Sequence, residues 1–338
     1  MTTSLVTGGA GFIGSHVVDE LLRLGHQVVV LDDLSGGFAD NVTPPAQLVA
    51  GSVVDQTLVN RLFAEHQFDY VYHLAAYAAE VLSPHIRRFN YTNNLLGTVT
   101  LANAAVNTGT VRCFVFTSSI AVYGRNQVPM TEDAVPRPED PYGIAKYACE
   151  LDLQALHALF GLPYIIFRPH NVYGERQNIG DRYRNVIGIF LNHALRGEPL
   201  PIFGDGAQTR AFSHIDDVAP VIARSVERPA AYNQVFNVGA DTPYTVNELA
   251  QVVAQAMGIE LRVNYLPARH EVTHAYSAHA KAQSVFGDLA QSVSLSEGVA
   301  RMAAWARSHG SRATKPFDGI EIPRHLPLAW AAAAARSG

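Results

Sequence analysis

Three side chains in this sequence could together move a proton to and from a hydroxyl group: Ser119, Tyr142 and Lys146. A free tyrosine loses its proton only at a pH of about 10, so alone it is a poor base. Lys146 follows Tyr142 by one helical turn and would share its helix face, where an ammonium group stabilises a phenolate. Ser119, directly after an expected strand, could hydrogen-bond the same substrate hydroxyl. These residues predict an acid/base centre for redox chemistry on an alcohol.

A glycine-rich turn near the start of the chain predicts the cofactor for that chemistry. Gly8, Gly11 and Gly14 stand between a short apolar run and a helical segment. Such glycines allow a tight turn, a close approach of phosphate to backbone, and close packing of helix on strand. Asp32 closes the next apolar run, and a carboxylate there accepts hydrogen bonds from a ribose but repels a 2′-phosphate. We therefore expect NAD rather than NADP, which the neighbouring Asp33 also favours.

The N-terminal half predicts the scaffold that positions these residues. Short apolar runs alternate with segments of helical periodicity, which is typical of an α/β fold with a doubly wound parallel sheet. The runs are continuously apolar, as strands buried on both faces require. The expected strands are 4–7, 27–32, 48–53, 70–74, 113–118 and 163–168, and the expected helices are 12–24, 57–66, 93–107 and 142–160.

Beyond residue 174 the pattern changes to loops rich in Gly, Pro and Arg. Helices are expected at 185–195 and 246–257, and a strand at 235–238 should return to the first sheet. We therefore expect a smaller lobe that is interleaved with the first domain. The expected division is an NAD-binding domain over 1–174 with a return segment near 208–240, a substrate-binding lobe mainly over 175–319, and a C-terminal extension over 320–338 without an assigned function.

The composition limits the class of protein. With 338 residues, 48% of them apolar, the chain can bury a sizeable core, yet no apolar run approaches a membrane crossing. A net charge of −5 without a basic stripe argues against a nucleic-acid partner. No leader precedes the first expected strand, so we expect cytoplasmic residence. Cys113 and Cys149 fit a reducing compartment, and we expect both in the core. The 14 histidines lack metal-ligand spacing, so no metal is expected.

Together these features resemble the extended short-chain dehydrogenase/reductase family and, within it, the nucleotide-sugar epimerase/dehydratase branch. The resemblance covers most of the chain and is strongest to the UDP-glucose (UDP-galactose) 4-epimerases. The segments that carry it are His73–Ala76 (HLAA), Asn93–Thr98 (NNLLGT), Ser118–Gly124 (SSIAVYG), Pro141–Lys146 (PYGIAK), Arg168–Gly174 (RPHNVYG) and Ile202–Arg210 (IFGDGAQTR).

The resemblance implies a Rossmann-type fold, NAD as cofactor, a UDP-sugar as substrate and a homodimer formed through helices 93–107 and 142–160. It assigns catalysis to Ser119, Tyr142 and Lys146. It also places two groups of binding residues. The NAD site would comprise Gly8, Gly11, Phe12, Ile13, Gly14, Asp32, Leu74, Ala75, Ala76, Asn93, Tyr142 and Lys146, and the substrate site Ser119, Asn171, Asn185, Phe203, Arg210 and Arg269. Arginines suit the substrate diphosphate because guanidinium groups bind phosphate oxygens in bidentate fashion.

The implied reaction is epimerisation of the UDP-sugar at C4 through a transient 4-keto intermediate, with Tyr142 as acid/base. A nucleotide-sugar 4,6-dehydratase is an alternative, but dehydratases carry Asp-Glu directly after the catalytic hydroxyl. Here those positions are Ile120 and Ala121, which cannot transfer protons. A UDP-uronic acid 4-epimerase is a further alternative. Against it stands Glu80, which follows the HLAA segment and would repel a substrate carboxylate.

The resemblance leaves the preferred sugar open. Ala275 falls where a tyrosine confines some epimerases to unacetylated hexoses. The small side chain leaves space for an N-acetyl group, so we expect UDP-N-acetylglucosamine to be accepted alongside UDP-glucose. A remote alternative from another class is a non-catalytic protein that binds NAD or a nucleotide-sugar. The intact acid/base set argues against it, since a pure binding protein has no need of one.

Overall fold

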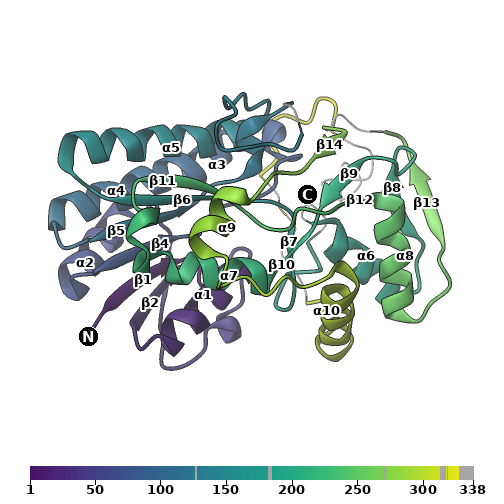
Figure 1. Cartoon of the computed structure of the whole chain (residues 1–338), viewed down its shortest axis with the longest axis horizontal. Coiled ribbons are helices and arrows are strands. Elements are labelled where there is room, and N and C mark those ends of the chain that lie inside the picture. The colour runs from purple at the N-terminus through teal and green to yellow at the C-terminus, as the bar shows by residue number, and fades with distance from the viewer. Residues whose placement is uncertain (126–127, 182–184, 269–271, 313–316, 318, 327–338) are drawn as a thin grey trace.

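The computed structural model describes residues 1–125, 128–181, 185–268, 272–312, 317 and 319–326. A parallel sheet of seven strands lies at the centre of the larger part of the molecule, on the left in Figure 1. Its strand order is β11-β6-β5-β4-β1-β2-β3. The order reverses between β1 and β4, and ligands bind doubly wound sheets at such a point. The sheet confirms the predicted fold class. Its strands are β1 (Thr3–Thr7), β2 (Gln27–Asp32), β3 (Gln47–Ala50), β4 (Tyr70–His73), β5 (Cys113–Thr117), β6 (Tyr164–Pro169) and β11 (Gln234–Val238).

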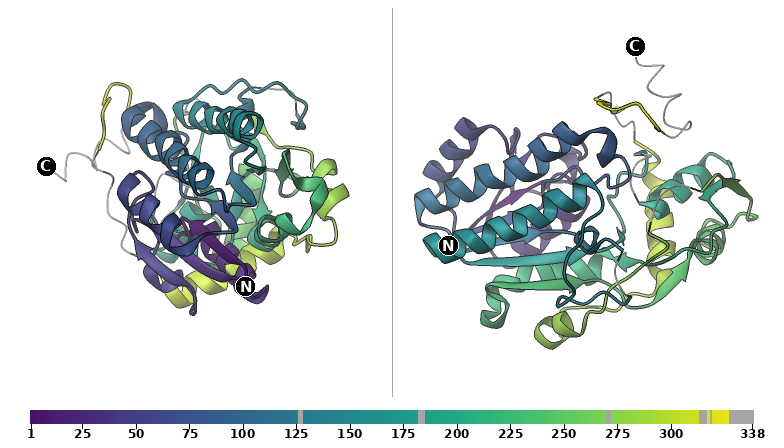
Figure 2. Two further views of the ribbon diagram at one scale, coloured as in Figure 1. Left: turned by 90° about the vertical axis from the view of Figure 1, so that its left-hand side faces the viewer. Right: turned by 90° about the horizontal axis from the view of Figure 1, so that it is seen from above.

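Helices cover both faces of this sheet (Figure 2) because its strands carry apolar side chains on both sides. In β1, for example, Leu5 and Val6 belong to different core clusters. Each of the two faces therefore buries its own core against helices. One face packs against α1 (Phe12–Arg23), α7 (Ile215–Arg224) and α9 (Ala280–Phe286), and the other against α2 (Gln56–His66), α4 (Gly97–Thr108) and α5 (Pro141–Phe160).

A second core forms the other end of the molecule, on the right in Figure 1. Helices α6 (Val186–Leu195), α8 (Val246–Met257) and α10 (Leu295–His309) pack there against small sheets. The chain passes between the two cores several times, since α7, β11 and α9 belong to the first. The small sheets pair β7 (Val172–Tyr173) with β10 (Ser213–His214), β8 (Leu200–Phe203) with β13 (Val263–Leu266), and β9 (Thr209–Ala211) with β12 (Pro243–Thr245) and β14 (His274–Ala275).

Most predicted elements are present, with corrections at their ends. The strand 27–32 and the helix 246–257 are confirmed to the residue, and β11 joins the first sheet as predicted, where it pairs with β6. The predicted strand 48–53 is too long. In the structure β3 ends at Ala50, and the chain then turns toward Asp55, which caps α2. The helix 93–107 starts too late, since α3 (Arg87–Tyr91) continues through a π-helical turn (Thr92–Leu96) into α4. Helix 185–195 begins one residue later, because Asn185 is its N-cap.

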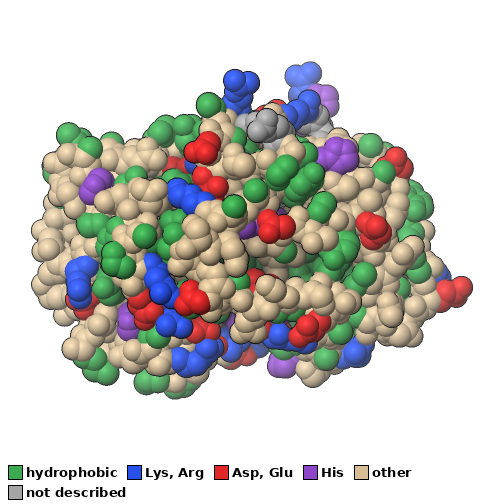
Figure 3. Space-filling model, viewed as in Figure 1, with side chains coloured by type: hydrophobic (Ala, Val, Ile, Leu, Met, Phe, Trp, Pro, Cys, Tyr) green, Lys and Arg blue, Asp and Glu red, His purple; other side chains and the backbone are tan. Residues whose placement is uncertain are grey.

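Cys113 and Cys149 are buried and unpaired, which confirms the predicted core positions. Acidic and basic side chains are interspersed on the face of the molecule shown in Figure 3. Among the described residues, no helix combines the length and the hydropathy needed to cross a bilayer.

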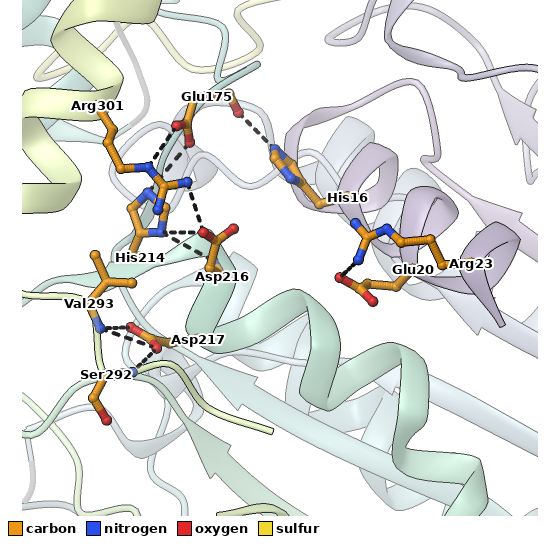
Figure 4. A network of polar contacts seen from close by, with 10 residues as sticks. All are labelled: His16, Glu20, Arg23, Glu175, His214, Asp216, Asp217, Ser292, Val293 and Arg301. Atoms are coloured by element: carbon orange, nitrogen blue, oxygen red, sulfur yellow. Dashed lines mark hydrogen bonds and ion pairs between the residues drawn. The ribbon is translucent and has the colours of Figure 1, made fainter. Parts of the chain in front are cut away.

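A charged cluster at Glu175 joins the two ends of the molecule (Figure 4). The Glu175 carboxylate lies 3.2 Å from Arg301 Nε of α10, and its backbone carbonyl oxygen lies 3.0 Å from His16 Nε2 of α1. Arg301 also reaches Asp216 at 2.8 Å, and buried His214 lies 3.5 Å from Glu175 Oε2. Burial raises the pKa of Glu175, but His214 and Arg301 outweigh this effect and bring it down to about 2. The folded protein therefore favours the ionised carboxylate.

The contribution of this carboxylate to the free energy of unfolding should depend on pH. Glu175→Gln should lower the free energy of unfolding at neutral pH by up to about 3 kcal/mol. The pKa of Glu175 is about 2 when folded, against the ordinary 4.5, so the difference should be full above pH 4.5 and vanish as the pH falls through 2. Urea unfolding across this range measures it. Glu65→Gln is the control, since Glu65 only pairs with Arg61 at the surface, at 3.9 Å. If Glu175→Gln and Glu65→Gln lowered the free energy of unfolding equally at neutral pH, the stabilising role of Glu175 would be contradicted.

Candidate active site

A cavity of about 960 Å³ opens at the carboxyl ends of β1, β4 and β5, and segments from both halves of the molecule line it. The structure brings together nearly all residues that the sequence predicts for the site. Arg269 lies outside the described residues. The predicted residues that line the cavity are Gly8, Gly11, Phe12, Ile13, Gly14, Asp32, Leu74, Ala75, Ala76, Asn93, Ser119, Tyr142, Lys146, Asn171, Asn185, Phe203 and Arg210.

The glycine-rich turn forms one wall of the cavity at the N-terminus of α1. Gly8 has a φ of +71°, which favours glycine, and a Cβ there would lie 2.7 Å from the backbone nitrogen of Ala75. A Cβ on Gly14 would lie 2.1 Å from the Gly8 carbonyl oxygen. Gly11 is the N-cap of α1, and the first helical turn carries no acidic residue. The wall therefore offers backbone N–H groups and a positive helix end, as a pyrophosphate requires.

Asp32 closes β2 beside this turn. Only 7% of its surface is exposed, and its carboxylate accepts hydrogen bonds from the N–H groups of Ala10 at 3.0 Å and Leu34 at 2.8 Å. Burial raises the pKa of Asp32, and these hydrogen bonds oppose the rise. The bonds fix the carboxylate at the cavity and leave lone pairs for ribose hydroxyls. Together with the turn, Asp32 fits the adenosine end of a dinucleotide.

Tyr142 and Lys146 lie on the first turns of α5, at the cavity. Lys146 is 2% exposed, and its ammonium group donates to the Thr117 carbonyl at 2.8 Å. The same group lies 4.7 Å from the centre of the Phe116 ring and 5.9 Å from that of Tyr142. Burial lowers the pKa of Lys146 to about 8, against the opposing effects of Cys149 and Glu150. At neutral pH the group is still mainly protonated, so a positive charge stands beside the Tyr142 phenol.

Ser119 reaches the cavity from the loop after β5. It is the N-cap of a short 3-10 helix (Ile120–Tyr123), and its hydroxyl accepts a hydrogen bond from the Ala121 N–H at 3.1 Å. Accepting this bond orients the hydroxyl and leaves its proton for donation. Ser119 can therefore donate to an oxygen atom in the cavity.

The predicted substrate residues come from several segments: Asn171 lies between β6 and β7, Asn185 is the N-cap of α6, and Phe203 and Arg210 lie in β8 and β9. Asn171 has a φ of +39°, and its amide donates to the Ala211 carbonyl at 3.1 Å. The Asn185 amide donates to the Val172 carbonyl at 2.9 Å while its oxygen caps α6. Arg210 donates to the carbonyls of residues 209, 272 and 273. These side chains thus hold the cavity wall, and their contact with a diphosphate stays a prediction.

Sequence reasoning missed the residues that hold Tyr142 in place. Asp140 caps α5 by accepting from the N–H groups of Tyr142 at 2.9 Å and Gly143 at 3.0 Å. Ser83, from a distant loop, donates to Asp140 at 3.1 Å and accepts from the Tyr142 N–H at 3.2 Å. The Asp-Pro pair at the helix start is a capping signal that identifies Asp140. No local pattern points to Ser83.

Sequence reasoning also missed a buried ion pair that holds Ser118, the neighbour of Ser119. Buried Glu150, on α5, accepts from the Ser118 hydroxyl at 2.5 Å and forms a bidentate pair with Arg168, at 3.0 and 2.5 Å. Arg168 also donates to the Tyr123 hydroxyl at 2.7 Å. The Glu150–Arg168 pair therefore fixes β6 to α5 and to the loop after β5, and the latter two carry the acid/base residues.

His73, in the HLAA segment, has a structural position. Its ring nitrogens lie 2.7 Å from the Thr7 hydroxyl and 2.9 Å from the Thr98 hydroxyl, so it joins β1 to α4. Burial, and to a smaller extent Lys146, lowers the pKa of His73 to about 3, which keeps the ring neutral. Within the described part of the chain, no three His, Cys, Asp or Glu residues are arranged to hold a metal ion.

Comparison with known proteins agrees with this geometry. Residues 4–239 match the sequence model of the NAD dependent epimerase/dehydratase family. The chain is 37% identical to the UDP-glucose 4-epimerase of Mycolicibacterium smegmatis, across 90% of this chain and 98% of that protein. It is similar to the structure of the Thermotoga maritima UDP-glucose 4-epimerase with UDP-glucose (TM-score 0.87, 36% identity, 91% of this chain, 99% of that one). It is also similar to the UDP-N-acetylglucosamine 4-epimerase of Methanobrevibacter ruminantium (TM-score 0.84, 30% identity, 91% and 98%).

The position of Asp32 leads to a test of the cofactor site. Asp32→Ala should weaken NAD binding by about 10- to 100-fold, because hydrogen bonds to a charged acceptor are lost. It should also reduce the preference for NAD over NADP, since the repulsion of the 2′-phosphate is removed. Calorimetric titration of cofactor-free protein with each dinucleotide measures both. Asp69→Ala is the matched control, because Asp69 accepts from the Thr3 N–H at the far end of β1. Unchanged NAD affinity in Asp32→Ala would contradict the assignment.

Proposed function

The chain belongs to the NAD-dependent epimerase/dehydratase family, as its motifs predict, and from this premise we propose that it interconverts UDP-glucose and UDP-galactose by epimerisation at C4. The observation that carries the proposal is the convergence of Ser119, Tyr142 and Lys146 on one cavity with the glycine turn and Asp32. This convergence supports an acid/base pair that acts beside a bound dinucleotide. The proposed division of labour has residues 1–174 bind NAD, with a return segment near 208–240, and residues 175–319 mainly bind the sugar nucleotide.

In the proposed mechanism, Tyr142 takes the proton of the C4 hydroxyl, and the charge of Lys146 stabilises the phenolate that accepts it. The Ser119 hydroxyl hydrogen-bonds the same oxygen and holds it beside Tyr142. NAD⁺, which the glycine turn and Asp32 would hold, would supply a reversible hydride acceptor at C4, so no external oxidant would be consumed. The 4-keto sugar turns about its diphosphate linkage between the two transfers. Tyr142 then returns the proton to the C4 oxygen of the sugar, which now presents its opposite face.

The diphosphate must stay bound while the sugar turns. We assign this task to Arg210, Asn171 and Arg269, with Asn185 and Phe203 beside the nucleotide-sugar. The support for Arg210 and Asn171 is that both line the same cavity as the glycine turn. The hydrogen bonds that both side chains donate to backbone carbonyl groups hold them in place before the substrate binds. This reduces the conformational entropy that is lost on binding.

The alternatives are disfavoured by residues of the cavity wall. Ile120 and Ala121 line the cavity where a 4,6-dehydratase needs a second acid and base, and neither can transfer a proton. Glu80 also lines the cavity, and its charge would repel the carboxylate of a UDP-uronic acid. A protein that only binds NAD or a nucleotide-sugar would need no buried lysine beside a tyrosine.

We also propose a homodimer in the cytoplasm. Leu96, at the end of the π-helical turn before α4, and Ile144 and Leu151, on α5, are 52%, 42% and 47% exposed. Ile144 and Leu151 stand two helical turns apart and so share one face of α5. An apolar face on two adjacent helices fits a helical interface between two copies.

The reaction can be tested directly by product analysis. The purified protein, without added reductant, is incubated separately with UDP-glucose, UDP-N-acetylglucosamine and UDP-glucuronate, and NMR follows the products. We expect the C4 epimer of UDP-glucose, and a kcat that is about 10²- to 10⁴-fold lower in Tyr142→Phe. Tyr147→Phe, on the same helix, should leave kcat unchanged. A 4-keto-6-deoxy product would instead indicate a dehydratase, and no reaction with any of the three would contradict the proposal.

The width of the cavity at Ala275 sets the expected sugar range. Ala275 lines the cavity and packs against the buried cluster of Val122, Tyr123 and Met130. We expect turnover of UDP-N-acetylglucosamine as well as UDP-glucose. Ala275→Tyr should abolish the first activity, because the ring fills the space of the N-acetyl group, and keep the second. Ala275→Ser is the matched control and should keep both. If the unmodified enzyme converts UDP-glucose but not UDP-N-acetylglucosamine, this expectation is wrong.

A further inference from the structure

The chain beyond α10 returns to the first half of the molecule, next to the cavity. Arg312 donates to the Asp40 carboxylate at 2.8 Å, and its guanidinium group lies 4.1 Å from the centre of the Phe38 ring. Phe317 and residues 319–326, which we call the C-terminal brace, then lie beside α3 (yellow in Figures 1 and 2). Residues 320–326 of the brace belong to the extension to which the sequence assigns no function, and Phe317 lies just before it.

Glu321 of the brace caps α3. Its carboxylate accepts hydrogen bonds from the backbone N–H groups of Arg88 and Phe89, each at 2.8 Å. The N-cap residue of α3 is Ile86, which has no side chain able to do this. The N–H groups at a helix start lack partners within the helix, so Glu321 supplies the cap from a distant part of the sequence. The N–H of Glu321 also donates to the His85 carbonyl, at 2.8 Å.

An apolar contact accompanies this cap. The Phe317 ring lies 5.2 Å from the Tyr77 ring and 4.8 Å from the Phe89 ring, measured between centres, and Tyr77 and Phe89 lie 5.2 Å apart. The three rings therefore pack on one another. Ile320 and Leu326 pack against the core formed by the loop 77–86.

The segments that the brace holds reach the candidate site by three routes. Tyr77, Glu80, Val81 and Pro84 line the cavity. Ser83, in the same loop, contacts Asp140 and the Tyr142 N–H, as described above. The carbonyl of Phe89 accepts from the amide of the predicted NAD residue Asn93, at 3.0 Å. A shift of the loop 77–86 or of α3 would therefore change the cavity wall directly.

We propose that the C-terminal brace positions the cavity wall for the sugar nucleotide, with Glu321 and Phe317 as positioning residues. The inference rests on the proposed function, because it takes the ligand of this wall to be a UDP-sugar. Neither residue lines the cavity, so both act through the loop 77–86 and α3. When the loop shifts, the contact of Ser83 with the Tyr142 N–H can be lost, but Asp140 still accepts from the N–H groups of Tyr142 and Gly143. Lys146 likewise keeps its bond to the Thr117 carbonyl. The brace should therefore affect substrate binding more than the chemical step.

The test compares Glu321→Ala and Phe317→Ala with the unmodified full-length enzyme. We expect KM for UDP-glucose to rise roughly two- to thirtyfold, while kcat changes less than about twofold. Glu321→Gln keeps one acceptor oxygen and should give an intermediate KM. Asp55→Ala is the matched control: Asp55 caps α2, which contributes no residue to the cavity, and KM should not change.

Hydrogen–deuterium exchange provides a readout that does not depend on turnover. Both variants should exchange the amides of residues 77–91 faster than the unmodified protein, and Asp55→Ala should not. Unchanged KM in Glu321→Ala and Phe317→Ala would overturn the proposal, whether or not exchange is faster. A fall in kcat with constant KM would overturn it as well. If the unmodified protein converts no UDP-sugar, the proposed function fails instead, and the affinity for UDP replaces KM as the test of the brace.

Discussion

The burial of one ammonium group, that of Lys146, is the constraint around which the candidate site is arranged. With 2% of its surface exposed, the lysine loses its hydration, and the loss brings its pKa down to about 8. The Thr117 carbonyl and the faces of the Phe116 and Tyr142 rings replace part of that hydration. These partners belong to β5 and α5. The charge can stay buried only while the end of the strand and the start of the helix keep their positions, and those positions put Tyr142 at the cavity.

Two sets of polar contacts hold α5 in place. Asp140 and Ser83 hold its first turn, and Glu150 fixes the helix to Arg168 of β6 and to Ser118 after β5. Glu150 and Arg168 are 0% and 4% exposed, so removing one partner would leave a buried charge without compensation. Such a pair tolerates little movement, which suits a site whose chemistry depends on the distance between a phenol and a hydroxyl.

The two ends of the cavity are built differently. The end that we assign to the cofactor is formed by the glycine turn and Asp32, on adjacent stretches of backbone where side chains would collide with the main chain. The end that we assign to the sugar is formed by loops such as 77–84 and by Arg210 and Ala275, which come from distant parts of the chain. These loops depend on contacts with other segments, including the C-terminal brace. Substrate preference can therefore change at one end of the cavity while the cofactor site at the other is preserved.

The sequence by itself determined the features that follow from local periodicity. Tyr142 and Lys146 meet because one helical turn separates them, and the glycine turn and Asp32 are recognisable because strand, turn and helix follow one another directly. The doubly wound sheet follows from the same alternation. The tertiary structure alone decided that Ser83 holds Tyr142, that His73 is a neutral link between β1 and α4, and that Glu321 caps α3. These partners lie far apart in the chain, and a contact of that kind leaves no periodic pattern in the sequence because only the packing of the whole fold brings its two sides together.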